Sequence, residues 1–152
     1  MKKWIPLVLL LVFMDMAAQV NEEAQIRHTI EAFFEGFHSK DSVLMKQSVM
    51  DGVITQTIGA SKDGKEVLKA EDFNSFLKSI VQIPDSVDFQ ERIRSFNIQI
   101  DGALANAWTP YEFWYNGNFS HCGVNSFQLF KDNGNWKIIY LIDTRRREGC
   151  EQ

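Results

Sequence analysis

The longest alternation of apolar and polar positions runs over residues 104–144 and predicts three antiparallel strands joined by two tight turns. The turns are Asn116-Gly117 and Asn133-Gly134, and both lie between runs of aromatic and β-branched residues. Asn-Gly favours a type I′ hairpin because both central residues of that turn adopt positive φ. Tight turns fix the register of the strands, and the register decides which side chains share a face.

A different pattern precedes the strands, with apolar residues at helical spacing. It predicts a first helix from Asn21 to about His38, a shorter helix capped by Ser39 or Asp41, and a third helix over 71–81. The buried stripes are expected to hold Ile26, Ile30, Phe33, Phe34 and Phe37 on the first helix, and Phe73, Phe76, Leu77 and Ile80 on the third.

The remaining strands are expected over 53–58, 89–100 and 103–115, and a polar loop over 59–69. The order of the elements is helices first and then a four-strand meander. This order predicts an α+β fold in which the helices pack on one face of a curved antiparallel sheet.

Two-residue turns throughout would place Glu112 opposite His121 across the first hairpin. The same counting puts Cys122 and Asp143 on the opposite face, where Asp143 and Arg145 could form an ion pair at a dimer interface. Pro110 marks an edge position or a bulge, and a bulge there would change the face of Trp108. The expected helix-facing side holds Trp108, Glu112, His121, Asn125, Phe127, Leu129, Trp136, Ile138, Tyr140 and Ile142.

The first residues predict a secretory signal peptide over 1–18, followed by a single domain over 19–152. Lys2 and Lys3 precede a short apolar core, and Ala17-Ala18 suit cleavage before Gln19. An uncleaved anchor is the alternative, although the apolar run is short for a membrane span. We therefore expect a periplasmic or secreted protein that does not associate with a membrane after cleavage.

The charge balance changes the range of partners. The chain has 16 basic and 20 acidic residues, and this acidic balance argues against nucleic acid and anionic membranes as partners. Arg145-Arg146-Arg147 is the only basic cluster, and it is either a solvated strand end or an anion site. Export permits a disulfide between Cys122 and Cys150, the only pair available; the alternative is a buried Cys122 and a free tail thiol.

The helical segment AQIRHTIEAFFEGFHSKDSVLMKQSV, the strand VITQTIG, the helix AEDFNSFLKSI and the closing strand GNWKIIYLIDT resemble, in this order, the nuclear transport factor 2-like superfamily. That superfamily includes ketosteroid isomerases and polyketide cyclases (SnoaL-like proteins), and SHCGVNSF is similar to an exported lumazine-binding-like subgroup. The resemblance implies a cone-shaped fold with the N-terminal helices on the concave face of the sheet. It also implies a pocket between sheet and helices, and frequent homodimers through the outer sheet face. No catalytic motif of the superfamily matches.

Glu112 and His121 are the candidate catalytic pair, because a carboxylate beside an imidazole raises the pKa of the ring and suits acid–base chemistry. The alternative is a cross-strand polar pair that closes the open end of the cone and has no catalytic role. The candidate ligand-binding residues are Trp108, Asn125, Tyr140, Phe33 and Phe37, although aromatic stripes at these spacings also form plain core. The histidines show no metal-ligand spacing, so we expect no metal and no cofactor.

Three functions remain open from the sequence. The first is an exported domain that binds a small apolar or aromatic molecule. The second is an acid–base isomerase, cyclase or dehydratase-like enzyme that uses His121 with Glu112. The third is a dimeric interaction module whose pocket is filled by its own side chains.

Overall fold

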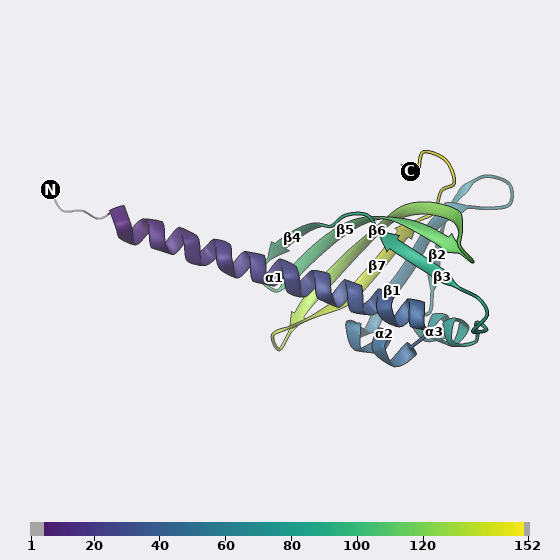
Figure 1. The fold of residues 1–152 in the computed structure, drawn as a ribbon, viewed down its shortest axis with the longest axis horizontal. Helices are drawn as coiled ribbons and strands as arrows, with labels where there is room; N and C mark the ends of the chain where they lie inside the picture. Colours follow the sequence, from purple (N-terminus) through teal and green to yellow (C-terminus); the bar gives the residue numbers. More distant parts are fainter. Residues whose placement is uncertain (1–4, 151–152) are drawn as a thin grey trace.

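The computed structural model describes the backbone of residues 5–150 and the side chains of residues 21–150. Three helices lie against a curved, open sheet of seven strands (Figure 1). The helices are α1 (Ile5–Ser39), α2 (Ser42–Ser48) and α3 (Phe73–Val81). The strands are β1 (Val49–Ala60), β2 (Glu66–Glu71), β3 (Phe89–Ile93), β4 (Asn97–Asp101), β5 (Leu104–Tyr115), β6 (Asn118–Asp132) and β7 (Asn135–Thr144).

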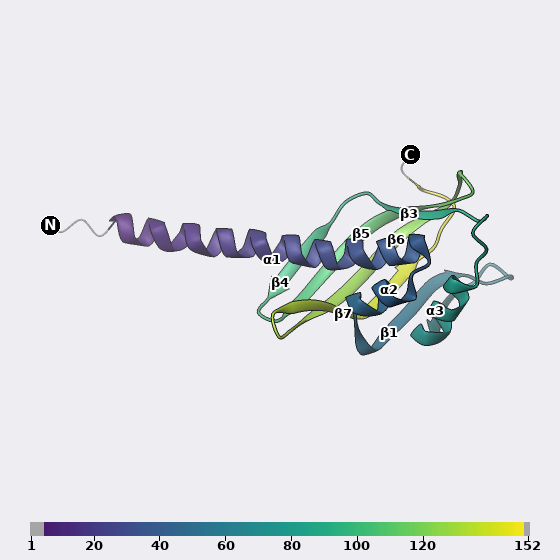
Figure 2. The same ribbon diagram turned by 60° about the horizontal axis from the view of Figure 1, so that its bottom comes forward.

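The sheet has the order β2-β1-β7-β6-β5-β3, and β4 pairs with β5 beyond the end of β3. The helices cover the concave side of this sheet, as Figure 2 shows from a second direction. The predicted α+β architecture is therefore confirmed. The expectation of a purely antiparallel sheet is wrong, because β1 runs parallel to β7.

The helices form where the apolar spacing predicts them. Asp41 caps α2 by accepting hydrogen bonds from the backbone N–H groups of Val43 and Leu44, and Asp72 caps α3 in the same way. The expected stripe of α1 is buried against the sheet. Gly36 lets α2 approach α1, because a Cβ at this position would lie 2.8 Å from the backbone nitrogen of Met45.

The N-terminal end of α1 differs from the expectation, since the helix begins at Ile5 rather than at Asn21. No Gly or Pro between Pro6 and Gly36 interrupts it. The predicted signal peptide lies partly outside the described residues, and its cleavage stays a prediction. None of the helices within residues 5–150 is long and apolar enough to span a membrane.

Two strand predictions were wrong. The expected polar loop over 59–69 contains most of β2, which pairs with β1 at the edge of the sheet. The expected strand over 89–100 is split into β3 and β4. The split lies opposite Pro110, which has no N–H group to donate to an edge partner. Pro110 thus marks an interrupted edge, one of the two alternatives that its presence predicted.

Both Asn-Gly turns form as expected, with positive φ at Asn116, Gly117, Asn133 and Gly134. Beyond each turn, however, the ladder contains a register shift. The first lies between Phe113 and Trp114 of β5, where Ser120 of β6 is the extra residue, and the second is at Ile139 of β7. A bulge of this kind exchanges the faces of every residue beyond it.

Candidate functional site

The predicted pairing of Glu112 with His121 is wrong. The bulge at Ser120 pairs Glu112 with Cys122 and Phe113 with His121. Because neighbouring residues of a strand point to opposite faces, Glu112 lies on the outer face of the sheet and His121 on the concave face. The two side chains cannot act on one ligand from these positions.

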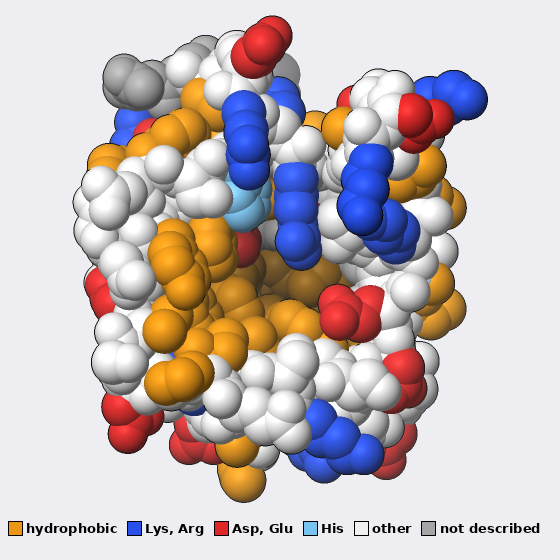
Figure 3. All heavy atoms as spheres, turned by 90° about the vertical axis from the view of Figure 1, so that its right-hand side faces the viewer, with side chains coloured by type: hydrophobic (Ala, Val, Ile, Leu, Met, Phe, Trp, Pro, Cys, Tyr) orange, Lys and Arg blue, Asp and Glu red, His pale blue; other side chains and the backbone are white. Residues whose placement is uncertain are grey.

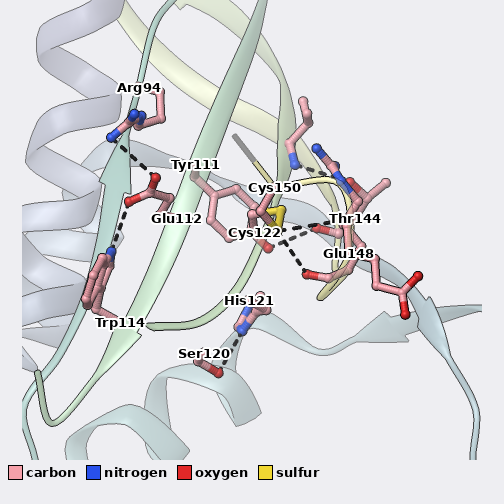
Figure 4. The surroundings of a disulfide bond; sticks show 12 residues. Arg94, Tyr111, Glu112, Trp114, Ser120, His121, Cys122, Thr144, Glu148 and Cys150 are labelled. Atoms are coloured by element: carbon pink, nitrogen blue, oxygen red, sulfur yellow. Dashed lines mark hydrogen bonds and ion pairs between the residues drawn. A yellow bond between two sulfur atoms is a disulfide. The ribbon is translucent and has the colours of Figure 1, made fainter. Parts of the chain in front are cut away.

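Glu112 has partners of its own on the outer face, as Figure 4 shows. Its carboxylate lies 3.3 Å from Nη1 of Arg94 and accepts a hydrogen bond of 3.1 Å from the indole N–H of Trp114. His121 stacks on Phe113, and its Nδ1 lies 3.1 Å from the hydroxyl of Ser120. Burial, helped by the charge of Arg145, lowers the pKa of His121 and so favours the neutral form of its imidazole.

The candidate ligand-binding residues divide into two groups. Phe33, Phe37 and Asn125 line a cavity between the helices and the sheet. Trp108 is half exposed on the outer face, where it pairs with Ser126. The bulge at Ile139 turns Tyr140 to the outer face, opposite Gln128. The expected positions of Trp108 and Tyr140 on the pocket face are therefore wrong.

This inner cavity has a volume of about 70 Å³. Phenylalanines of α1 and α3 form its apolar wall together with Leu141 of β7. The residues of this wall are Phe33, Phe34, Phe37, Phe76 and Leu141. Figure 3 shows the hollow from its open end, with a hydrophobic floor, Lys, Arg and His side chains along one part of its border and acidic side chains along another.

The opposite wall of the inner cavity is polar and centres on Glu91 of β3. The side-chain amide of Asn125 donates a hydrogen bond of 2.6 Å to Oε1 of Glu91. Burial raises the pKa of Glu91 to about 8, and the nearby negative charge of Asp143 adds to the effect. Glu91 is therefore mostly protonated at pH 7 and can hold or release a proton near neutral pH.

Asp143 of β7 is the second carboxylate of the inner cavity, although the predicted register placed it on the opposite face. The ion pair with Arg145 exists, with Nε 2.8 Å from Oδ2, but it lies at the cavity rather than on the outer face. The hydroxyls of Thr57 and Tyr111 also donate to Asp143. Burial raises the pKa of Tyr111, which keeps its hydroxyl protonated.

His38 at the end of α1 connects the helix to this site. Its Nε2 accepts a hydrogen bond of 2.9 Å from the backbone N–H of Glu91. This role needs a neutral ring with its proton on Nδ1, and burial lowers the pKa of His38 accordingly. The contact fixes the strand that carries Glu91 against the helix that carries the phenylalanine wall.

The last residues of the chain, 145–150, form a C-terminal arm beside the opening of the inner cavity. Cys122 of β6 and Cys150 form a disulfide, with their Cα atoms 5.8 Å apart (Figure 4). Arg146 exchanges two backbone hydrogen bonds with Cys122. The end of β7, from which the arm continues, can approach β6 because residue 123 is glycine: a Cβ there would lie 1.7 Å from the carbonyl oxygen of Thr144.

The arm and the β1–β2 hairpin enclose an open cleft of about 1320 Å³, which we call the cationic bay. Its charged lining comprises Lys62, Lys69, Arg145, Arg146, Arg147, Glu66, Glu71 and Glu148, and His121 also borders it. Thr57, Glu71 and Arg145 line both the bay and the inner cavity. The two spaces are therefore neighbouring parts of one site.

Sequence reasoning missed Glu91, Asp143 and Arg145 as site residues. A signal for Glu91 was present, because it lies between Phe89 and Ile93 at alternate positions of one strand, where an apolar residue is expected. A charged residue in that position indicates a polar site inside the protein. Asp143 carried no such signal, since its face depends on the bulge at Ile139. No group of His, Cys, Asp and Glu within the described residues could hold a metal ion.

The fold has many structural counterparts. An NTF2-like protein of unknown function from Shewanella baltica superposes with a TM-score of 0.60 at 19% identity, covering 85% of this chain and 97% of that one. An NTF2-like protein with a cystatin-like fold from Novosphingobium aromaticivorans gives 0.67 at 10% identity, with coverages of 91% and 90%. The protein has the nuclear transport factor 2-like fold. Identities this low establish the fold and leave the function open.

A third counterpart with the nuclear transport factor 2-like fold is provisionally described as the beta subunit of an aromatic-ring-hydroxylating dioxygenase from Novosphingobium aromaticivorans. Its TM-score is 0.67 at 14% identity, and the alignment covers 89% of this chain and 95% of that one. Neither a protein-family model nor a curated protein matches the sequence. The similarity to the lumazine-binding-like subgroup stays a prediction.

Proposed function

We propose that the protein is an exported domain that binds a small apolar or aromatic molecule at the inner cavity. The observation that carries the proposal is the composition of this cavity. One wall consists of phenylalanine rings, and the other presents Glu91, Asn125 and Asp143. Ligand sites characteristically combine an apolar lining with a few convergent polar groups. A cavity of this kind also argues against an interaction module whose pocket is fully occupied by its own side chains.

Binding of single-ring aromatic probes tests this proposal. Benzyl alcohol and indole are titrated into the purified protein, and saturable binding is followed by ligand-observed NMR and thermal shift. Leu141→Trp should abolish binding because the indole fills the cavity, while Ile142→Trp, on the outer face of the same strand, should leave it unchanged. Both variants are checked by circular dichroism. Binding that persists in a folded Leu141→Trp variant would contradict the proposal.

An acid–base enzyme with isomerase, cyclase or dehydratase-like chemistry is the second candidate, and one observation favours it. Glu91 is half-buried, its carboxyl has a pKa of about 8, and the carboxylate of Asp143 lies nearby. Such a group can accept and return a proton near neutral pH. In this version Glu91 and Asp143 take the roles that the sequence assigned to His121 and Glu112.

Proton exchange measures this second function without a known substrate. Acetophenone offers an aromatic ring and acidic C–H bonds next to a carbonyl group. The enzyme hypothesis predicts that the protein accelerates deuterium incorporation from D₂O at that carbon. The rate should rise toward pH 8 as Glu91 loses its proton, and Glu91→Gln should remove the acceleration. An equal rate with and without Glu91 would exclude Glu91 as the base.

Export is part of the proposal because two features support it together. The first 18 residues have the pattern of a signal peptide, and the disulfide between Cys122 and Cys150 suits an oxidising compartment. Expression of the full chain with its N-terminus intact, followed by cell fractionation and intact mass measurement, tests it. The expected product begins at Gln19, is found outside the cytoplasm and has both thiols oxidised.

We further propose a homodimer through the outer sheet face. Large apolar side chains are exposed there, including Trp108 at 50% and Phe130 at 38% of their surface. Such patches on a soluble protein characteristically mark contact surfaces. Light scattering after gel filtration should give twice the mass of one chain. Trp108→Lys combined with Phe130→Lys should give a folded monomer, and an unchanged mass would exclude this face.

A further inference from the structure

The cationic bay has a charge composition opposite to that of the chain. Five Lys or Arg residues and three Glu residues line it. The whole chain instead has 16 basic and 20 acidic residues. In an acidic protein, a cleft with a surplus of cations attracts anions selectively, because the remaining surface repels them.

Most of this positive charge is available to a ligand. Arg145 is bound to Asp143 through Nε, and its side chain keeps 53% of its surface exposed. Lys62, Lys69, Arg146 and Arg147 form no ion pair with any residue of the described chain. Four exposed cations therefore face the same cleft without a carboxylate partner.

The bay also adds the volume that the inner cavity lacks. The inner cavity, at about 70 Å³, is smaller than typical ligand pockets, which measure about 300–1,000 Å³. A ligand that places a small apolar group against the phenylalanine wall must extend outward. The direction available is past Thr57 and Arg145, which border both spaces.

We propose that the cationic bay binds the anionic group, a carboxylate or a phosphate, of a small ligand whose apolar part occupies the inner cavity. This inference rests on the proposed binding function and adds the chemical class of the ligand. Arg145 contacts the anion at the boundary of the two spaces, and Arg146 and Arg147 contribute from the C-terminal arm. A small molecule fits better than an anionic macromolecule, because the bay leads into an enclosed cavity rather than along an extended surface.

The disulfide has a defined role in this arrangement. It joins Cys150 to β6 and so holds Arg146 and Arg147 beside the β1–β2 hairpin. Without this bond, the first two residues of the arm are still held, Arg145 by its backbone hydrogen bond to Ile58 and its ion pair with Asp143, and Arg146 by its backbone pairing with Cys122. The disulfide is the covalent link that holds the rest of the arm to the sheet. The arginines would then be held less firmly, and binding of an anion would have to order them.

Three probes of one ring size test the proposal: benzyl alcohol, benzoate and phenyl phosphate. Affinities are measured by calorimetry or NMR titration at low ionic strength. Both anions should bind about tenfold more tightly than the alcohol, since charge-assisted hydrogen bonds to Arg are the stronger ones. The advantage should shrink as salt is added. The order of benzoate and phenyl phosphate tells which anion the bay prefers.

A charge-matched pair of variants assigns the effect to the bay. Arg146→Gln with Arg147→Gln should weaken binding of the anions about tenfold and leave benzyl alcohol within twofold. Lys46→Gln with Lys78→Gln removes the same charge from exposed positions on α2 and α3. This control should change neither the affinity for the anions nor the affinity for benzyl alcohol. Reduction of the disulfide with a phosphine should weaken binding of the anions and leave binding of benzyl alcohol unchanged. Circular dichroism verifies that the reduced protein is folded.

The outcomes separate this inference from the proposed function. Suppose that benzyl alcohol binds as tightly as the anions and that Leu141→Trp abolishes its binding. The cavity then binds ligands, and the proposal that the ligand is an anion is wrong. If the arginine variant binds the anions normally, the bay does not recognise them. If none of the probes binds, both proposals fail. Preferential binding to phosphatidylglycerol vesicles, lost in the same arginine variant, would replace the small anion by a membrane surface.

Discussion

The two ends of the protein interior lie on the same strands and have opposite chemistry. Toward the N-terminal half of α1, the concave face presents Phe127 and Leu129 of β6 with Trp136 and Ile138 of β7, all buried. Toward the arm, the same two strands present Asn125 and Asp143. One end is a dry core, and the other is a polar site enclosed by protein.

The difference shows how one sheet serves both stability and binding. The dry end buries apolar surface, which is the main favourable term in folding. The polar end keeps a protonated carboxyl, an ion pair and a buried hydroxyl network at a cost in desolvation. Groups that are costly to bury and remain partly accessible are typical of functional sites. Substitutions at the two ends should therefore have different signatures.

The largest expected effect is at the dry end. Phe127→Ala removes a fully buried ring from the strand that carries both regions and should destabilise the protein by about 3–5 kcal/mol. Urea unfolding measures the loss. Phe130→Ala, the same change on the outer face of β6, is the control and should cost less than about 1 kcal/mol in the monomer. Equal losses would mean that the dry end does not dominate stability.

Gly123→Ala should have the next largest effect, because it affects the boundary between β6 and the arm. The added Cβ would lie 1.7 Å from the carbonyl oxygen of Thr144 and 2.8 Å from the ring of Tyr111. The end of β7 must shift, and we expect a loss of about 1–3 kcal/mol in urea unfolding. Gly59→Ala is the matched control, since its nearest contact is 3.9 Å away. Equal stability of the two variants would contradict the close approach at Gly123.

The polar end should make stability depend on pH. Burial raises the pKa of Glu91 from its ordinary 4.5 to about 8 in the folded protein, so the folded state holds a proton that the unfolded state releases. The stabilisation is complete below about pH 4.5 and is lost as the pH rises to about 8. Glu91→Gln should remove this decline, which we expect to be on the order of 1–3 kcal/mol. If the free energies of unfolding of the wild type and Glu91→Gln depend on pH in the same way, the carboxyl of Glu91 is not protonated in the folded protein.

The smallest expected effect concerns Thr109, between the two ends. Its hydroxyl is fully buried and makes no hydrogen bond within the described residues. Thr109→Val replaces it by a methyl group of similar shape and should be neutral or stabilising by up to about 1 kcal/mol. Thr57→Val is the matched control, because its hydroxyl donates to Asp143, and it should destabilise by about 1 kcal/mol. A clear loss at Thr109 would reveal a partner for its hydroxyl.

The dry end could be predicted from the sequence more completely than the polar end. Ile26, Ile30 and Phe33 follow a helical period, and Phe127, Leu129 and Ile138 lie close enough to the Asn-Gly turns for simple counting to place them. Asn125 was also placed on the correct face, because the predicted register, although wrong about the partners of β6, assigned the alternate residues of β6 to the correct faces. The local apolar spacing and the two turns are enough to predict which face these residues occupy, and the tertiary structure places them on that face.

The chemistry of the polar end depended on two residues that carry no local signal. Ser120 and Ile139 each add one residue to a ladder, and a serine or an isoleucine fits a regular strand equally well. Counting from the turns therefore placed Glu112 in the pocket and Asp143 outside it, which is the reverse of the structure. Bulges are favoured by the curvature of the sheet as a whole, which the strands considered in pairs do not reveal.

The placement of the chain ends has a practical consequence for experiments on this molecule. Glu22, near the dry end, contacts Lys131 and Trp136, whereas Arg147 and Glu148 border the bay itself. The start of α1 and the end of the C-terminal arm lie far apart along the long axis (Figure 1). An affinity tag or surface tether attached in front of Glu22 leaves the opening clear, and a C-terminal fusion places its bulk at the entrance. The choice of tag thus decides whether a ligand screen examines an accessible site.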